Sequence, residues 1–234
     1  MSRTTEDRFP ALRVHIPDPE VRELFTWPFL RVSEIFDELA DAASAEVLRR
    51  AGAWPVAPGT SPSALVAARG WAPRSLPLVA FVHRKLAASG FLAESAGTYA
   101  PTGSEPGDLA TLEAELAAVE PDAAVAGEAV RILVDEAGLF LSGERTGEEI
   151  LFRVDRLPLW FRYFSNRNLL YAVNNVLGAL ALSRLLPESG ARVLEIGGGA
   201  GSAAEVALAR LGPRVSRYLF TEVVPTFFRR GERA

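Results

Sequence analysis

RVLEIGGGAGSAAEVALARLGPRVSRYLFTEVVP, residues 192–225, is the stretch that decides the fold. It opens with a short apolar run, 193–196, which lies between turn-forming residues and is typical of a buried parallel strand. Four glycines follow, and from Ser202 the apolar residues recur at helical spacing until Gly212 and Pro213 end the helix. A second strand over 218–221 then ends at Glu222. This order of strand, glycine turn, helix and strand predicts the beginning of a Rossmann-like sheet.

The glycine turn and the acid beyond the second strand together predict a site for a nucleoside-containing cofactor. Glycines allow a tight turn and leave room for a ligand where a Cβ would clash. The helix that follows offers unpaired N–H groups at its first turn. Glu222 lies roughly 20 residues after the last glycine, the distance at which an acid can accept both hydroxyls of a ribose. The glycines concerned are Gly197, Gly198, Gly199 and Gly201.

The identity of the cofactor depends on an acid inside the first strand. Gly199, Gly201 and Ala204 satisfy the dinucleotide pattern G-x-G-x-x-G/A, so NAD and FAD stay open on this pattern alone. However, a carboxylate from Glu195 that faced the site would repel a pyrophosphate and would suit a cationic ligand with an amino group. A turn without any ligand is the remaining alternative for the glycines.

The run Glu195-x-Gly197-x-Gly199-x-Gly201 resembles motif I of the class I S-adenosylmethionine (SAM) methyltransferases, and Glu222 falls at the position of their ribose-binding acid. Over most of its length the chain resembles the carbon-methyltransferase domains of polyketide synthases. The match is tightest in VLEIGGGAG and in YLFTEVVPTFF, where that family typically has Y-x-F-T-D-x-S-x-x-F. Here Glu222 replaces the aspartate, which keeps the charge but lengthens the side chain. Val224 replaces the serine, and Ala200 stands where a threonine is usual.

This resemblance implies SAM as cofactor and a β-ketoacyl or malonyl-type substrate on an acyl carrier protein, methylated at its α-carbon in natural-product biosynthesis. It also implies neighbouring synthase domains, or the remainder of the catalytic domain, as partners. The family's catalytic His and Glu lie beyond the second strand, so the base is expected beyond residue 234 and no catalytic residue is assigned. Small-molecule O-methyltransferases share the domain order and remain an alternative. A non-catalytic methyltransferase-like or DNA-binding module is a third possibility.

The sequence predicts an α/β chain with a mainly α N-terminal region, in three parts. Residues 1–103 are expected to form a winged-helix-like domain, with helices that begin at Ser61 and Ser75 and a hairpin after them. Residues 104–187 are expected to form a helical linker or lid, and 188–234 the truncated start of the SAM-binding domain. A lid would bring Tyr171, Asn174 and Asn175 to face the cofactor, whereas a linker would leave them solvated.

Two predicted strands fall short of the six of a Rossmann-order sheet, and two parallel strands with open edges are not stable alone. We therefore expect the chain to be part of a longer polypeptide or to need a partner. By itself it should bind SAM weakly or not at all and show no turnover. Its two histidines, His15 and His83, precede the glycines and are expected at the periphery and on a helix face.

The composition of the chain argues against several other classes of protein. The chain has 234 residues and a net charge of −4, which argues against bulk affinity for nucleic acid. The second winged-helix helix is apolar where a recognition helix presents polar groups, which also argues against DNA binding. With no cysteine, the chain has no disulfide and no thiol nucleophile, and its sequence shows no metal-binding constellation. Without a signal peptide or a membrane-spanning run, the sequence predicts a cytoplasmic protein.

Overall fold

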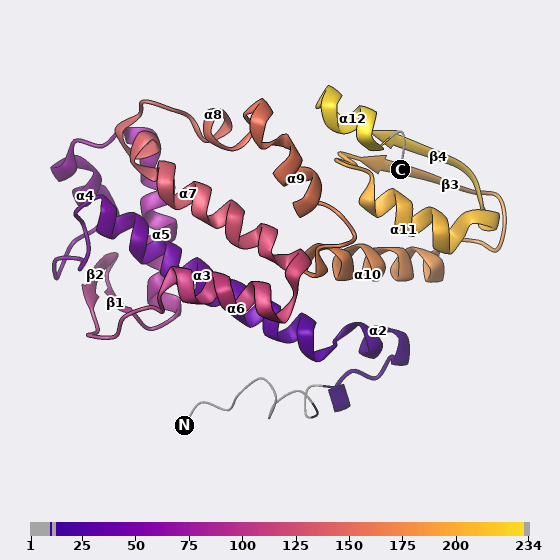
Figure 1. Cartoon of the computed structure of the whole chain (residues 1–234), viewed down its shortest axis with the longest axis horizontal. Helices are drawn as coiled ribbons and strands as arrows, with labels where there is room; N and C mark the ends of the chain where they lie inside the picture. Colours follow the sequence, from indigo (N-terminus) through magenta and orange to yellow (C-terminus); the bar gives the residue numbers. More distant parts are fainter. Residues whose placement is uncertain (1–9, 11–12, 232–234) are drawn as a thin grey trace. The chain divides into compact units, whose positions relative to one another are not determined.

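The computed structural model describes residue 10 and residues 13–231, and Figure 1 shows its helices and strands. The chain divides into two compact units, one made of Met1–Ser33 and Pro158–Ala234 and the other of Glu34–Leu157. These limits differ from the predicted domain ends at 103 and 187. The segment before Glu34 joins the C-terminal unit, and the predicted linker 104–187 is divided at Pro158. The ends of the predicted domains, residues 1–9, 11–12 and 232–234, lie outside the described residues.

The unit Glu34–Leu157 is helical with one small hairpin. Its elements are most of α3 (Trp27–Arg50), α4 (Pro62–Arg69), η1 (Pro73–Ser75), α5 (Leu76–Ala88), β1 (Leu92–Ser95), β2 (Thr98–Pro101), α6 (Leu109–Val119), η2 (Pro121–Ala123), α7 (Ala124–Ser142), α8 (Gly147–Leu151) and η3 (Val154–Arg156). Strands β1 and β2 pair antiparallel. The order helix, turn, helix and hairpin is therefore present as predicted, and its assignment to a winged helix stays a prediction.

In this unit, two of three predicted capping residues form the expected hydrogen bond at the start of their helix. The Ser61 hydroxyl accepts a hydrogen bond from the Ala64 amide at 3.2 Å, which begins α4 as predicted. The spacing of Thr146 and Glu149 predicts a capping box, and Thr146 begins α8 with it. Ser75 occupies the predicted N-cap position of α5 but does not cap the helix with its side chain. It ends the 3₁₀ turn η1 in helical backbone conformation, and its buried hydroxyl makes no capping bond.

The inward face of α5 contains a histidine that the sequence placed on the helix surface. His83 is fully buried, and its ring lies 5.1 Å from the ring of Tyr99 on β2. Its Nδ1 contacts the Val79 carbonyl oxygen at 2.7 Å, while Nε2 has no hydrogen-bond partner among the described residues. Burial lowers the pKa of His83, and the contact with Val79 acts in the opposite direction. His83 is therefore part of the core.

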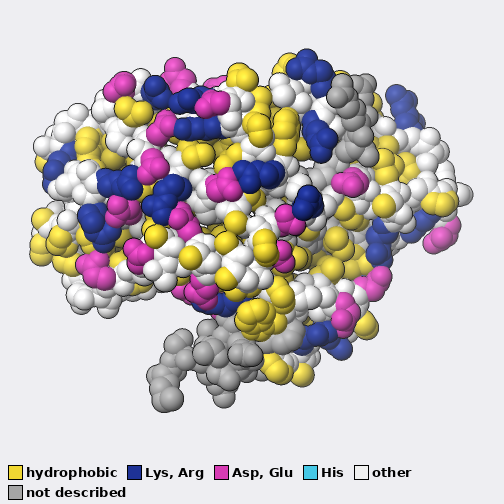
Figure 2. All heavy atoms as spheres, viewed as in Figure 1, with side chains coloured by type: hydrophobic (Ala, Val, Ile, Leu, Met, Phe, Trp, Pro, Cys, Tyr) yellow, Lys and Arg dark blue, Asp and Glu magenta, His cyan; other side chains and the backbone are white. Residues whose placement is uncertain are grey.

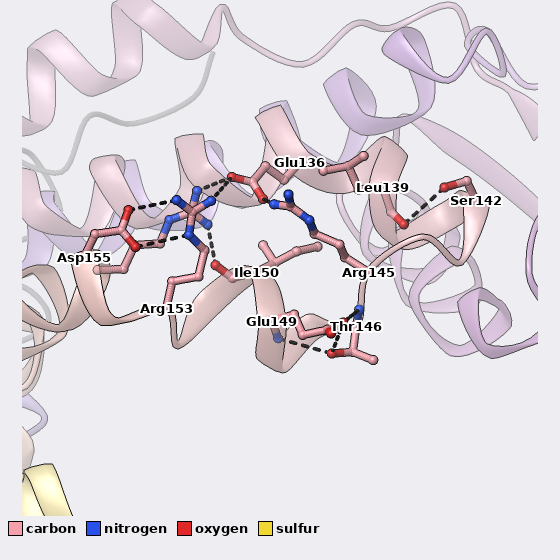
Figure 3. A network of polar contacts seen from close by, with 10 residues as sticks. Glu136, Leu139, Ser142, Arg145, Thr146, Glu149, Ile150, Arg153 and Asp155 are labelled. Atoms are coloured by element: carbon pink, nitrogen blue, oxygen red, sulfur yellow. Dashed lines mark hydrogen bonds and ion pairs between the residues drawn. The ribbon is translucent and has the colours of Figure 1, made fainter.

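A second polar feature of this unit joins α7 to the segment after it. The Glu136 carboxylate forms ion pairs with Arg145 at 3.5 Å, with Arg153 at 3.9 Å and with Arg156 (Figure 3). Arg156 also donates to the Ile150 carbonyl oxygen, and both its side chain and that of Glu136 are mostly buried. We call this cluster the Glu136 clamp. It holds α8 and η3 against α7.

The surface carries charges of both signs. Figure 2 shows basic and acidic side chains interspersed over the visible face. On α3, Glu46 pairs with Arg49 at 2.5 Å and with Arg50 at 2.9 Å, and Arg50 also pairs with Asp135 at 2.6 Å. None of the described helices is both long and apolar enough to cross a membrane.

The other unit contains the sheet that the sequence predicted. Its elements are α2 (Pro19–Leu24), α9 (Leu157–Tyr163), α10 (Leu169–Leu185), β3 (Ala191–Ile196), α11 (Ser202–Leu211), η4 (Gly212–Arg214), β4 (Val215–Thr221) and α12 (Pro225–Gly231). Strands β3 and β4 pair parallel, with Val193 opposite Tyr218. Strand β4 begins three residues before its predicted start, directly after η4. Helix α11 has its predicted limits.

Helices cover one face of this two-stranded sheet. Helix α10 packs along α11 (Figure 1), and the core between them includes Ala179, Ala207 and Leu211. Tyr218 packs against this core from β4. The side chains of Leu194, Ile196 and Leu219 are 58%, 81% and 45% exposed, so the described elements leave an apolar strip of the sheet open.

We predict that His83 makes the stability of the helical unit depend on pH. Because burial lowers the pKa of His83 in the folded chain, this histidine becomes protonated below about pH 6.5 in the unfolded chain while it stays neutral in the folded chain. The free energy of unfolding should therefore fall by on the order of 1 kcal/mol as the pH drops from 7 to 5. Urea titrations at the two pH values should show this loss in the parent and not in His83→Phe. The variant His15→Ala, which removes the exposed histidine, should behave like the parent; an equal pH dependence in His83→Phe would contradict the prediction.

For the Glu136 clamp we expect Glu136→Gln to lower the free energy of unfolding by about 1–3 kcal/mol, since it leaves the mostly buried Arg156 without its counter-charge. Glu148→Gln removes an exposed carboxylate from α8 and is the matched control, with an expected change below about 0.5 kcal/mol. Equal urea midpoints for the two variants would show that the clamp contributes nothing.

Candidate functional site

The candidate site lies where β3 turns into α11. The turn is closed by backbone hydrogen bonds from the Gly198 amide to the Thr221 carbonyl oxygen at 2.9 Å and from the Gly201 amide to the Gly198 carbonyl oxygen at 3.0 Å. The Thr221 hydroxyl donates to the Glu195 carbonyl oxygen at 2.8 Å. The ends of both strands are therefore tied to the turn, as the strand order predicted.

The four glycines of the turn are needed for different reasons. Gly197, Gly199 and Gly201 have φ angles of 70°, 57° and 85°, in the left-handed region that disfavours other residues. A Cβ at Gly197 or Gly199 would meet no atom within 4 Å, so the space beside them is open. A Cβ at Gly198 would lie 2.1 Å from the Phe220 ring. The packing of Phe220 thus requires a glycine at position 198. The open space of the turn lies beside Gly197 and Gly199.

Glu222 lies directly against this turn. One carboxylate oxygen accepts a hydrogen bond from the Gly199 amide at 2.9 Å, and the other accepts from the Val224 amide at 2.7 Å. The Glu222 side chain thus reaches from the end of β4 to the turn after β3. Each carboxylate oxygen can accept a second hydrogen bond. The two amides therefore orient Glu222 and leave it able to accept hydroxyl groups of a ligand.

Glu195 is half-buried and pairs with a tyrosine on the neighbouring strand. The Tyr218 hydroxyl donates to its carboxylate at 3.0 Å. Burial raises the pKa of Glu195, and the hydrogen bond from Tyr218 acts in the opposite direction. Burial and the charge of Glu195 also raise the pKa of Tyr171. Contact of Glu195 with a cationic ligand stays a prediction.

The two asparagines predicted to face the cofactor are placed differently from one another. Asn174 is exposed. Asn175 is buried, and its side-chain amide donates to the Asn166 side-chain oxygen at 2.8 Å. Asn175 is thus already held by a neighbour in the chain. The cofactor-binding role of both residues stays a prediction.

Sequence reasoning missed several residues around the site. Tyr218 and Phe220 were taken only as strand residues, although the register of β3 and β4 would have placed Tyr218 near Glu195. Asn166 lies in the turn between α9 and α10, where no periodicity marks it. Phe227 on α12 is buried, with its ring 5.5 Å from that of Phe161 and 6.2 Å from that of Phe164. Phe164 in turn packs against Tyr171 at 5.4 Å.

No protein-family model matches the chain, and no curated protein matches its sequence. Solved structures do resemble it. The CurJ carbon methyltransferase is 22% identical with a TM-score of 0.70 over 96% of this chain. The DszA carbon methyltransferase is 21% identical with a TM-score of 0.67 over 100% of the chain. The CMeT domain of the citrinin polyketide synthase is 15% identical with a TM-score of 0.66 over 97% of the chain.

These alignments cover 62%, 62% and 63% of the three solved chains, so this chain spans less than two thirds of their length. At sequence identities of 15–22%, the similarity to these structures shows a shared fold and nothing about activity. The chain therefore has the fold of the carbon methyltransferases, as its resemblance to the carbon-methyltransferase domains of polyketide synthases implied.

Proposed function

We propose that this chain is the N-terminal portion of a SAM-dependent carbon methyltransferase and that SAM binds at the glycine turn between β3 and α11. The observation that carries the proposal is the position of Glu222, which two backbone amides hold beside the open side of Gly197 and Gly199. The shared fold with carbon methyltransferases supports it.

Each predicted residue then has a part in holding the cofactor. Glu222 would accept the ribose hydroxyls on the oxygen positions that its amide contacts leave free. Gly197 and Gly199 would let the nucleoside approach the backbone. Glu195 and Tyr171 would lie toward the amino-acid end of SAM, where a carboxylate favours a cation. The remaining predicted cofactor-binding residues lie in the turn and on α10; these are Gly198, Gly201, Asn174 and Asn175.

We propose a carrier-protein-bound acyl substrate, either β-ketoacyl or malonyl-type, in cytoplasmic natural-product biosynthesis. The support is the sequence resemblance and the polyketide synthase origin of one solved structure of the same fold. SAM supplies an already activated methyl group, so the protein's task is to orient donor and acceptor. A carbon acceptor also needs a base for its α-proton. His83 is buried in the helical unit, and we place the base outside the described residues.

We also propose that further elements cover the open apolar strip of the sheet in the active enzyme. Leu194, Ile196 and Leu219 are the kind of side chains that a helix packs against in an α/β sheet. Until they are covered, the site lacks part of its support. For this reason we expect the chain alone to bind SAM weakly and to show no turnover.

A dinucleotide remains the alternative ligand, and one observation favours it. Ala204, the third position of the dinucleotide pattern, is buried on the inner side of α11, where a small residue permits close packing of helix and strand. The glycine turn would then hold a pyrophosphate. The half-buried carboxylate of Glu195 opposes this reading, and a competition experiment separates the two ligands.

We predict that S-adenosylhomocysteine shifts the ¹⁵N amide resonances of Gly197, Gly199 and Gly201 in a saturable way, because NMR detects even millimolar binding. NADH should shift them less at the same concentration. Glu222→Ala should weaken the binding at least tenfold, since it removes an acceptor of two ribose hydroxyls.

Glu188→Ala is the matched control for this experiment. Its side chain is 96% exposed and lies in the loop before β3 of the same unit. It should bind as the parent does. Absence of any saturable shift with S-adenosylhomocysteine, or a stronger response to NADH, would refute the proposed cofactor.

A further inference from the structure

We infer that Asn166 is a positioning residue that anchors the first turn of α11 and thereby sets the geometry of the glycine turn. Its effect on cofactor affinity rests on the function proposed above. Its effect on the turn itself does not, and the experiment below measures both.

The Asn166 side chain connects three segments of the chain. Its amide nitrogen donates to the Ser202 carbonyl oxygen at 2.8 Å and to the Glu205 carboxylate at 2.9 Å. Its oxygen accepts from the Asn175 side chain at 2.8 Å. Two acceptors face the nitrogen and one donor faces the oxygen, so the reversed amide would put its oxygen against two other oxygens. We call these four residues the Asn166 clasp.

The first turn of α11 needs such an anchor because its own sequence lacks one. Gly201 is the N-cap residue of α11 and has no side chain with which to cap the helix. Three of the four residues before it are glycines, which lose more backbone entropy on folding than any other residue. Ser202 and Glu205, the two α11 residues that Asn166 contacts, lie in the turn directly after Gly201. The clasp therefore fixes the end of the glycine turn from outside.

The other side of the clasp leads to α10. Asn175 is buried on this helix, four residues after Tyr171 and thus on the same side of it. The ring of Tyr171 packs against that of Phe164, just before the turn that carries Asn166. The turn that carries Asn166 is itself fixed, because the buried Asn168 side chain donates to the Tyr163 carbonyl oxygen at 2.8 Å. A shift of α10 would therefore reach the glycine turn through Asn166.

The test is Asn166→Asp, which has nearly the same shape. The aspartate can still accept from Asn175, but it cannot donate to Ser202 and it repels Glu205. Hydrogen exchange of the protein without ligand should speed up about threefold or more at Gly199, Gly201 and the first turn of α11. It should stay unchanged in β3 and in the last turn of α11.

A second substitution should reverse the effect. In Asn166→Asp with Glu205→Gln, the glutamine amide can donate to the new carboxylate and restore a hydrogen bond between the turn and α11. Exchange should return toward that of the parent, which a general loss of stability would not do. Ser216→Ala is the control. The Ser216 hydroxyl donates to the carbonyl oxygens of Gly190 and Ala191, at the other end of the sheet.

Binding of S-adenosylhomocysteine gives the second readout. We expect Asn166→Asp to weaken it about three- to tenfold and the double variant to recover most of the loss. If Asn166→Asp fails to fold, Asn175→Ala, which removes one bond of the clasp, should show the same changes to a smaller degree. Unchanged exchange at Gly199 and Gly201 in Asn166→Asp, or no recovery in the double variant, would overturn the inference. Failure of the parent to bind the ligand would instead count against the proposed function alone.

Discussion

The candidate site depends on one contact, the carboxylate of Glu222 against the amides of Gly199 and Val224. It joins the end of β4 to the turn that follows β3, so the two parallel strands and the start of α11 share one fixed point. Hydrogen bonds to a carboxylate are stronger than those between neutral groups. A turn made of glycines has little of its own to hold it in one conformation. The acid that we propose as the ribose ligand is therefore also what keeps the turn in shape.

The sequence predicted the parts of this site whose signals are local. The apolar run of β3, the glycines and the helix over 202–211 each have a pattern of their own, and their order along the chain determined the fold class. The capping residues Ser61 and Thr146 were recognised for the same reason, since the cap and its partner lie within three residues. The structural similarity to solved carbon methyltransferases confirms the fold, although the sequences are only 22% and 21% identical.

What the sequence did not predict depends on contacts between distant residues. His83 has a helical position that fits either face of α5, and it is buried where the ring of Tyr99 on β2 packs against it. Asn175 is held by Asn166, nine residues earlier across a turn, a contact that no local pattern marks. The space beside Gly198 is filled by a ring from the next strand, which its place in the glycine run does not indicate. Polar and glycine residues satisfy several kinds of environment, so their roles follow from tertiary neighbours.

Gly198 and Phe220 carry a consequence for how this turn can change over time. The first has no room for a side chain because of the ring of the second, so the first is not free to vary alone. Enlarging position 198 requires a smaller residue at 220. A larger residue at 198 should therefore arise in related sequences only together with a smaller one at 220. The turn glycines with left-handed backbone have no such compensating partner and should stay fixed.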